Sequence, residues 1–422
     1  MSATLVGTSG LILLFVLIAL RVPIAISLIG VSLGGITLAF NLKVALGVLS
    51  AVPYTFAASW TLSSVPMFLF MGFLAYHTGL TQGLFRAART WVGTLPGGVA
   101  IASVLGAGGF SAVTGSSIAC AAAMGRIAIP EMRKSGYEDS IATGTLAAAG
   151  TIGALIPPSI VLILFGIQAQ VSILKLFLFG FYVGVATLAL YSLVIVGLAI
   201  LRPELLPRGA PVPLRERMRA LVDVWPLLLV VVGIFGGLVA GWFTTTEAGA
   251  VGTLLTAIIG LMRRQLSYDA FKSSVMDTLL GGGSLFLVAI GANVFTRFVA
   301  LTGLTGAMND WIQAVAPTAF GLLVIIVVFY LIVGMFLEPV GAMLLTLPLL
   351  LPIVKSAGID IIWFGVLVAK LLEMGMITPP VGLNVFVIQS VSDRVPLEKI
   401  FRGVLWFLCA DLLLVAGMIL LR

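Results

Sequence analysis

Long apolar stretches alternate with short polar connections along the whole chain. Ten of them run to about the length that crosses a hydrocarbon core, which takes roughly 20 helical residues. The expected spans cover residues 4–20, 24–40, 64–80, 139–168, 176–201, 224–242, 247–262, 281–300, 361–390 and 403–421. The pattern predicts an all-α polytopic membrane protein, with a hydrophilic cytoplasmic linker at residues 202–223.

Two further apolar stretches, residues 97–130 and 317–352, are too long for one crossing and are interrupted by Gly, Pro and polar residues. Irregular backbone at membrane depth is tolerated only where protein or a cavity covers it. Each stretch is therefore predicted to form a re-entrant helical hairpin.

Composition and charge narrow the class of protein. Hydrophobic residues make up 60% of the chain and charged residues 9%, against about 25% charged residues in soluble domains. The net charge of +7 comes from basic residues at span ends, which excludes a nucleic-acid patch and predicts a periplasmic N-terminus. With two cysteines and one histidine, neither a zinc site nor a nucleophile pair is expected, so we predict no enzyme and no organic cofactor.

Three amphipathic stretches, residues 82–92, 268–279 and 306–315, are expected to lie at the membrane surface in contact with lipids. His77, at the inner end of its span, is interpreted as an interfacial residue in preference to a proton carrier.

The two halves of the chain are similar. A shift of 222 residues superposes Gly and Pro positions in equivalent segments: Pro130 on Pro352, Gly136 on Gly358, Gly153 on Gly375, and Pro157-Pro158 on Pro379-Pro380. The predicted repeats are residues 1–201 and 224–422. Because each repeat crosses the membrane an odd number of times, the second is inverted relative to the first, as is common in secondary transporters.

Two of the spans are expected to break at midspan. Residues 150–159 and 373–384 each contain a Pro-Pro pair and two glycines, and proline inside a helix removes a donor and clashes with the preceding turn. Unwound carbonyls there suit a dehydrated cation, and the positive ends of half-helices suit an anionic cargo.

The hairpin tips carry the matching polar groups. The first tip, residues 111–117, is rich in hydroxyls, and the second, residues 334–341, contains Glu338. Each tip is expected to meet the broken span of its own repeat, and these oxygens favour sodium over a transition metal. Two alternatives stay open: the hydroxyls bond carbonyls of their own helices, and Glu338 or Glu373 pairs with a cation such as Lys370 instead of binding a ligand.

Several motifs resemble the large membrane subunit of tripartite ATP-independent periplasmic transporters. They are Gly115-Ser116-Ser117, residues 125–132, Ser135-Gly136-Tyr137, residues 150–159 and residues 376–384. The resemblance covers essentially the whole chain. It implies an ion-transporter-superfamily fold and an elevator-type, sodium-driven import of a small organic acid across the bacterial inner membrane. It also implies two partners, a separate small four-span membrane subunit and a soluble periplasmic substrate-binding protein.

The same resemblance implies site residues. A first sodium site would use Thr114, Gly115, Ser116, Gly150, Gly153, Pro157 and Ser159. A second would use Glu338, Gly341, Gly375, Thr378, Pro379 and Gly382. The substrate carboxylate would lie between the tips, with Thr114, Ser116, Ser117, Ser159, Arg297 and Asn384 as substrate-binding residues. For Arg297, snorkelling to the headgroups is the competing interpretation.

The runner-up function is a single-component sodium–carboxylate symporter of the same fold, which needs no binding protein. A passive channel is a further alternative, because inverted repeats also permit one.

Overall fold

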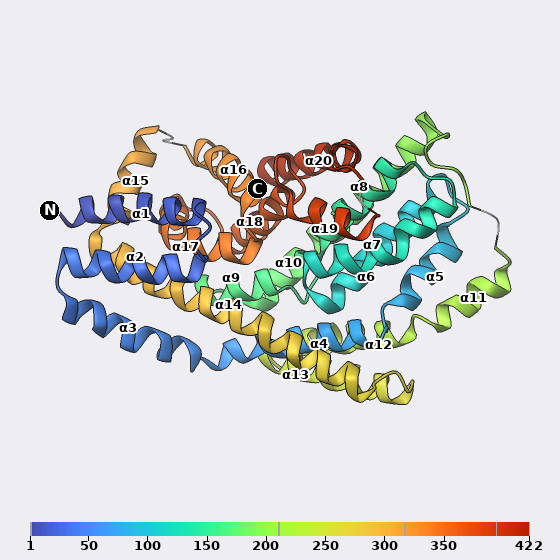
Figure 1. Cartoon of the computed structure of the whole chain (residues 1–422), viewed down its shortest axis with the longest axis horizontal. Coiled ribbons are helices and arrows are strands. Elements are labelled where there is room, and N and C mark those ends of the chain that lie inside the picture. Colours follow the sequence, from blue (N-terminus) through green and yellow to red (C-terminus); the bar gives the residue numbers. More distant parts are fainter. Residues whose placement is uncertain (1, 210–211, 316–317, 394, 422) are drawn as a thin grey trace.

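The chain forms an all-helical protein in a computed structural model (Figure 1). The structure describes residues 2–209, 212–315, 318–393 and 395–421, and within these ranges it contains helices and no strand. The predicted all-α class is confirmed.

The helices of the first half are α1 (Ala3–Ala19), α2 (Ile24–Ala39), α3 (Leu42–Ala57), η1 (Trp60–Ser63), α4 (Ser64–His77), α5 (Gln82–Val92), α6 (Gly98–Thr114), α7 (Ser117–Lys134), α8 (Asp139–Gly150), η2 (Thr151–Ala154), α9 (Ile160–Ala169) and α10 (Ile173–Leu201). Those of the second half are α11 (Leu214–Val222), α12 (Trp225–Val239), α13 (Thr245–Met262), α14 (Tyr268–Thr302), α15 (Leu304–Val315), α16 (Ala319–Phe336), α17 (Pro339–Ser356), α18 (Ile361–Gly375), α19 (Leu383–Val391) and α20 (Leu397–Leu420).

The two halves repeat the same order of helices. The first hairpin, α6 and α7, corresponds to the second hairpin, α16 and α17, and α7 and α17 start and end at positions that differ by 222 residues. The broken pairs α8–α9 and α18–α19 follow in turn. The Pro157-Pro158 and Pro379-Pro380 peptide bonds are both cis.

One pair of equivalent segments differs between the halves. The first half bends by 58° between α3 and the η1–α4 segment, whereas its counterpart α14 is one helix of 35 residues. The separate amphipathic stretch predicted at residues 268–279 is therefore wrong: it continues without interruption into the following span. No proline occurs in α14, and helix-interior glycine is unfavourable by only about 1 kcal/mol relative to alanine.

Fewer helices than expected reach the length of a membrane crossing. Within the described ranges six are long and apolar enough, or up to eight if each bent pair counts as one span. The prediction of ten crossings exceeds this number. α1 and α2 are 17 and 16 residues long, and each broken span is divided into two shorter helices.

The broken helices exchange partners between the repeats. α9, from the first repeat, packs in one apolar core with α17 and α18 of the second repeat, where the Phe165 and Phe364 rings lie 6.2 Å apart. α19, from the second repeat, packs in another core against α7 and α8 of the first. This exchange brings both breaks together at the centre of the molecule.

Small residues permit the closest crossing between the repeats. A Cβ atom on Gly403 of α20 would lie 1.8 Å from the Ser140 carbonyl oxygen of α8, and one on Gly144 would lie 2.4 Å from Gly403. Such backbone-to-backbone approach is the role that glycine has in membrane helix packing.

Candidate functional site

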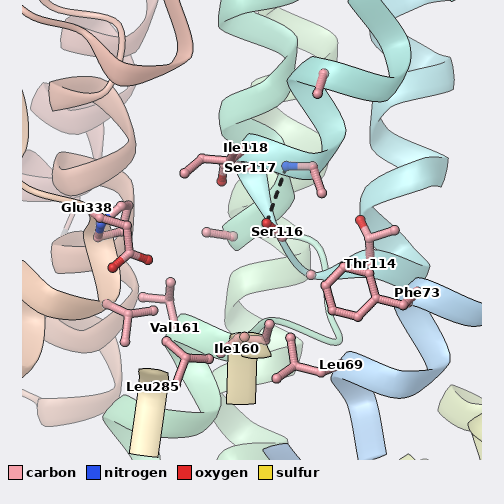
Figure 2. A pocket seen from close by; sticks show the side chains of 18 of the residues that line it. Leu69, Phe73, Thr114, Ser116, Ser117, Ile118, Ile160, Val161, Leu285 and Glu338 are labelled. Atoms are coloured by element: carbon pink, nitrogen blue, oxygen red, sulfur yellow. Dashed lines mark hydrogen bonds between the residues drawn. The ribbon is translucent and has the colours of Figure 1, made fainter. Parts of the chain in front are cut away.

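A cavity of about 580 Å³ lies where the two hairpin tips and the two breaks meet, within the usual range for a small-molecule site. We call it the central cavity. Its main polar lining comes from Thr114, Ser116, Ser117, Tyr76, Ser284, Glu338 and Glu373. Figure 2 shows Glu338 on one side, opposite the hydroxyl-bearing first tip.

The first tip is a tight turn fixed by its sequence. α6 ends at Thr114, and Gly115 adopts a left-handed conformation (φ 59°) that favours glycine. Ser116 then caps α7, with its hydroxyl accepting a hydrogen bond from Ala119 N at 3.4 Å. As a result the first turn of α7, with its free backbone N–H groups, lines the cavity.

The first break runs from η2 to the start of α9. Ser159 spans it, because its buried hydroxyl donates to the Ala154 carbonyl oxygen at 2.6 Å and accepts from Leu162 N at 3.2 Å. A Cβ atom on Gly153 would lie 2.8 Å from Ser117 Cα, and one on Gly115 would lie 2.4 Å from the Pro158 carbonyl oxygen. The first tip and the first break are therefore in direct backbone contact.

The second tip uses a carboxylate where the first uses a hydroxyl. Glu338 caps α17 by accepting a hydrogen bond from Gly341 N at 3.2 Å, and Pro339 opens the helix. Both Glu338 and the first residues of α17 line the cavity.

The second break follows the same plan. A Cβ atom on Gly375 would lie 2.4 Å from the carbonyl carbon of Gly334 in α16. The Thr378 hydroxyl donates to the Met374 carbonyl oxygen at 2.7 Å. Asn384 is fully buried and its Nδ2 donates to the Ala147 carbonyl oxygen of α8 at 3.4 Å, so this amide joins the second break to the first broken span.

Lys370 pairs with a different acid from the one considered in the sequence. Its Nζ lies 2.5 Å from Asp411 Oδ1 of α20, with both side chains fully buried. Tyr191 donates to Asp411 Oδ2 at 2.7 Å, and its hydroxyl lies 3.3 Å from Thr151 Oγ1 in η2. These four residues form the buried ion-pair cluster. The alternative that Glu373 pairs with Lys370 is wrong: the two lie three positions apart on α18, but Lys370 Nζ reaches Asp411 on α20.

The structure brings some of the predicted site residues to the cavity and not others. Thr114, Gly115, Ser116, Ser117 and Glu338 line it. The following predicted residues are not among those that line it: Gly150, Gly153, Pro157, Ser159, Gly341, Gly375, Thr378, Pro379, Gly382 and Asn384.

The prediction that Arg297 binds the substrate in the cavity does not agree with the structure. Its side chain is exposed on α14 and does not line the central cavity. His77, in contrast, has a partner at the end of its helix, because its Nε2 lies 2.8 Å from Asp277 Oδ2.

Glu373, which the sequence left open as a ligand or an ion-pair partner, lines the cavity, and two polar lining groups were missed by sequence reasoning: Tyr76 of α4 and Ser284 of α14. A signal for the last was present, since Gly281-Gly282-Gly283 precedes it inside a span. Of these glycines, Gly281 lines the cavity, where a Cβ atom on it would lie 3.9 Å from the Phe73 ring.

The family described as the tripartite ATP-independent periplasmic transporter, DctM component, matches residues 11–422. The C4-dicarboxylate TRAP transporter large permease protein DctM of Pseudomonas aeruginosa is 36% identical over 352 residues, which cover 82% of this chain and 81% of that protein. The sialic acid TRAP transporter large permease protein SiaM of Vibrio cholerae is 32% identical over 351 residues, with 82% and 81% covered.

A solved structure supports the fold alone. The YdaH transporter of Alcanivorax borkumensis aligns with a TM-score of 0.64 at 16% sequence identity, covering 89% of this chain and 87% of that chain. The match over residues 11–422 and the two large-permease relatives show that the chain belongs to the family of tripartite ATP-independent periplasmic transporters, as a DctM component.

Proposed function

We propose that this chain is the transport subunit of a secondary importer that moves a small organic acid across the bacterial inner membrane, driven by a sodium gradient. The observation that carries the proposal is the convergence of both hairpin tips and both breaks on one cavity. The two relatives are named for a C4-dicarboxylate and for sialic acid, both of which are carboxylates.

Two helix N-termini support an anionic cargo. The first residues of α7 and α9 line the central cavity, and the N-terminus of a helix carries free N–H groups and about half a positive charge. The N-terminus of α17 also lines it but is capped by the Glu338 carboxylate. The cargo carboxylate would lie between the tips, close to Ser116 and Ser117.

Oxygen donors at the tips support sodium as the coupling ion. At the first tip Ser117 Oγ is buried without a hydrogen-bond partner, beside the Thr114 and Ser116 hydroxyls and the carbonyls of the break from Gly150 to Ser159. At the second tip, Glu338 lies on the hairpin whose Gly334 contacts Gly375. Thr378 lies in the break just beyond Gly375. Sodium, a hard cation, prefers such ligands.

An elevator movement is the proposed mechanism. The hairpins and broken helices would move as one transport body, since their cores exchange helices between the repeats. α4 and α14, which close the other side of the cavity, would belong to the stationary scaffold. A small four-span membrane subunit and a soluble periplasmic binding protein would complete the importer, as the name of the family implies three components.

Uptake into vesicles tests the proposal. The chain is reconstituted with and without the small subunit and binding protein, and accumulation of labelled organic acids is measured under an inward sodium or potassium gradient. We expect accumulation only with both partners and with sodium. Uptake by this chain alone would support the single-component symporter instead, and equal uptake without a sodium gradient would indicate a passive channel.

A further inference from the structure

Glu373 is a buried acid in the cavity wall to which the proposed transport cycle assigns no role. It lies in the last turn of α18, is 1% exposed, and lines the central cavity. Neither of its carboxyl oxygens has a hydrogen-bond partner. The Ser117 hydroxyl of the first tip is the side-chain donor that acts on this carboxyl group, although the two do not meet in hydrogen-bond geometry and neither has another partner.

The protein does not neutralise this group locally. Lys370, the cation acting on Glu373, is held at 2.5 Å by Asp411, which acts on Glu373 with the opposite sign. Glu338 adds a like charge from the other tip, and its Oε2 is occupied by Gly341 N. Among the described lining residues none is Lys, Arg or His. A buried carboxyl group without a partner is unfavourable, so a partner from outside the chain is expected.

We propose that Glu373 accepts a hydrogen bond from the cargo, and that the cargo is therefore an organic acid with an O–H or N–H donor close to its carboxylate. This inference rests on the proposed function. The donor must be close to the carboxylate because Glu373 lies near Ser117 in the first turn of α7, where the helix N-terminus would hold that carboxylate. The class is a 2-hydroxy or 2-amino acid, or a larger acid with that arrangement.

The same geometry disfavours the binding of two kinds of cargo. An acid with no donor leaves Glu373 unpartnered in the complex, and a site built to bond a donor rejects an analogue that lacks it. A second carboxylate in place of the donor would face Glu338 and Glu373, and the described lining supplies no Lys, Arg or His beside them. Both kinds are expected to bind more weakly.

Ligand-induced thermal stabilisation of the purified full-length chain, in sodium-containing buffer, tests this with four matched acids. They are butyrate, 2-hydroxybutyrate, 2-aminobutyrate and succinate. We expect the hydroxy acid, the amino acid or both to stabilise at concentrations about tenfold or more below butyrate and succinate, the factor that corresponds to one hydrogen bond to a charged group. Comparing 2-hydroxybutyrate with 2-aminobutyrate shows whether the donor is a hydroxyl or an ammonium group.

Variants test whether Glu373 causes the preference for donor-bearing acids. Glu373→Gln should reduce the preference for the donor-bearing acids to within about threefold, whereas Glu204→Gln, an exposed loop control, should keep it. Equal or tighter binding of butyrate or succinate to the wild-type chain overturns the proposal, whether or not the variant folds. Stabilisation by none of the four acids overturns it together with the proposed binding of an organic acid, so the two failures are distinguishable.

Discussion

Individual buried charges dominate the energetics at the scale of the residue. Lys370 and Asp411 are both fully buried and form an ion pair with each other in place of contacts with water. Tyr191 donates a further hydrogen bond to the Asp411 carboxylate. Removing one partner from such a pair leaves an uncompensated charge, which destabilises by about 3–5 kcal/mol, whereas removing both is often tolerated.

The first prediction follows from this asymmetry. Lys370→Met should lower the apparent unfolding temperature of the purified protein strongly, and the double variant Lys370→Met/Asp411→Leu should recover most of the loss. Lys175→Met, at an exposed site on α10, is the control. A double variant as unstable as the single one would show that the pair does not act as a unit.

Some residues of the site could be predicted from the sequence and others could not. Thr114, Ser116, Ser117 and Glu338 could be predicted because tip residues follow from the interruption of an apolar run. The partner of Lys370 could not, because Asp411 is 41 positions away, and only the packing of α18 against α20 brings the two together.

At the scale of the element, each hairpin holds its break by backbone contact. Gly375 and Gly334 approach so closely that a Cβ atom would lie 2.4 Å from a carbonyl carbon. Main-chain atoms cannot rotate aside as a flexible side chain does, so a methyl group there must displace the second tip from the break.

The second prediction is that Gly375→Ala lowers sodium-dependent uptake at least about tenfold and destabilises the protein by about 1–3 kcal/mol, as overpacking does. Gly197→Ala in α10 should leave both unchanged, because its Cβ atom would meet nothing within 4 Å. Vesicle uptake and thermal unfolding measure the two effects. Normal uptake by Gly375→Ala would contradict the proposed importance of this contact.

The positions of the hairpins and broken spans could be predicted from the sequence better than whether a given segment forms one helix or two. The hairpin and broken-span segments follow from Gly and Pro positions, and their helices begin and end close to the expected residues. The bend before α4 and the unbroken α14 were not predicted. Residues 268–279 are amphipathic and the rest of α14 is apolar. The local pattern does not specify whether the two parts form one helix, because α14 packs along α2 and α4, which are distant in the sequence.

At the scale of the whole molecule, the repeats are interlocked by the exchange of α9 and α19. Each apolar core contains helices from both halves, so neither half can complete its own core. Burial of apolar surface is the main favourable term in folding, and each half alone would expose the faces that the other covers.

The third prediction concerns a split chain. A cut within residues 203–208, before α11, should give two fragments that purify as a stable complex after co-expression and that aggregate when expressed singly. Size-exclusion chromatography in detergent distinguishes the results. Two separately stable, monodisperse halves would show that the repeats fold independently.

The central claim is that the cavity between the two tips binds the coupling ion and the cargo. Ile118, at the start of α7, lines this cavity and is 38% exposed, so Ile118→Cys in a Cys120→Ala/Cys409→Ala background reports on the tip. We predict that sodium, compared with choline, slows its reaction with a thiol reagent severalfold, and that Tyr182→Cys on the exposed face of α10 reacts equally in both. Equal labelling of Ile118→Cys with and without sodium would contradict the account.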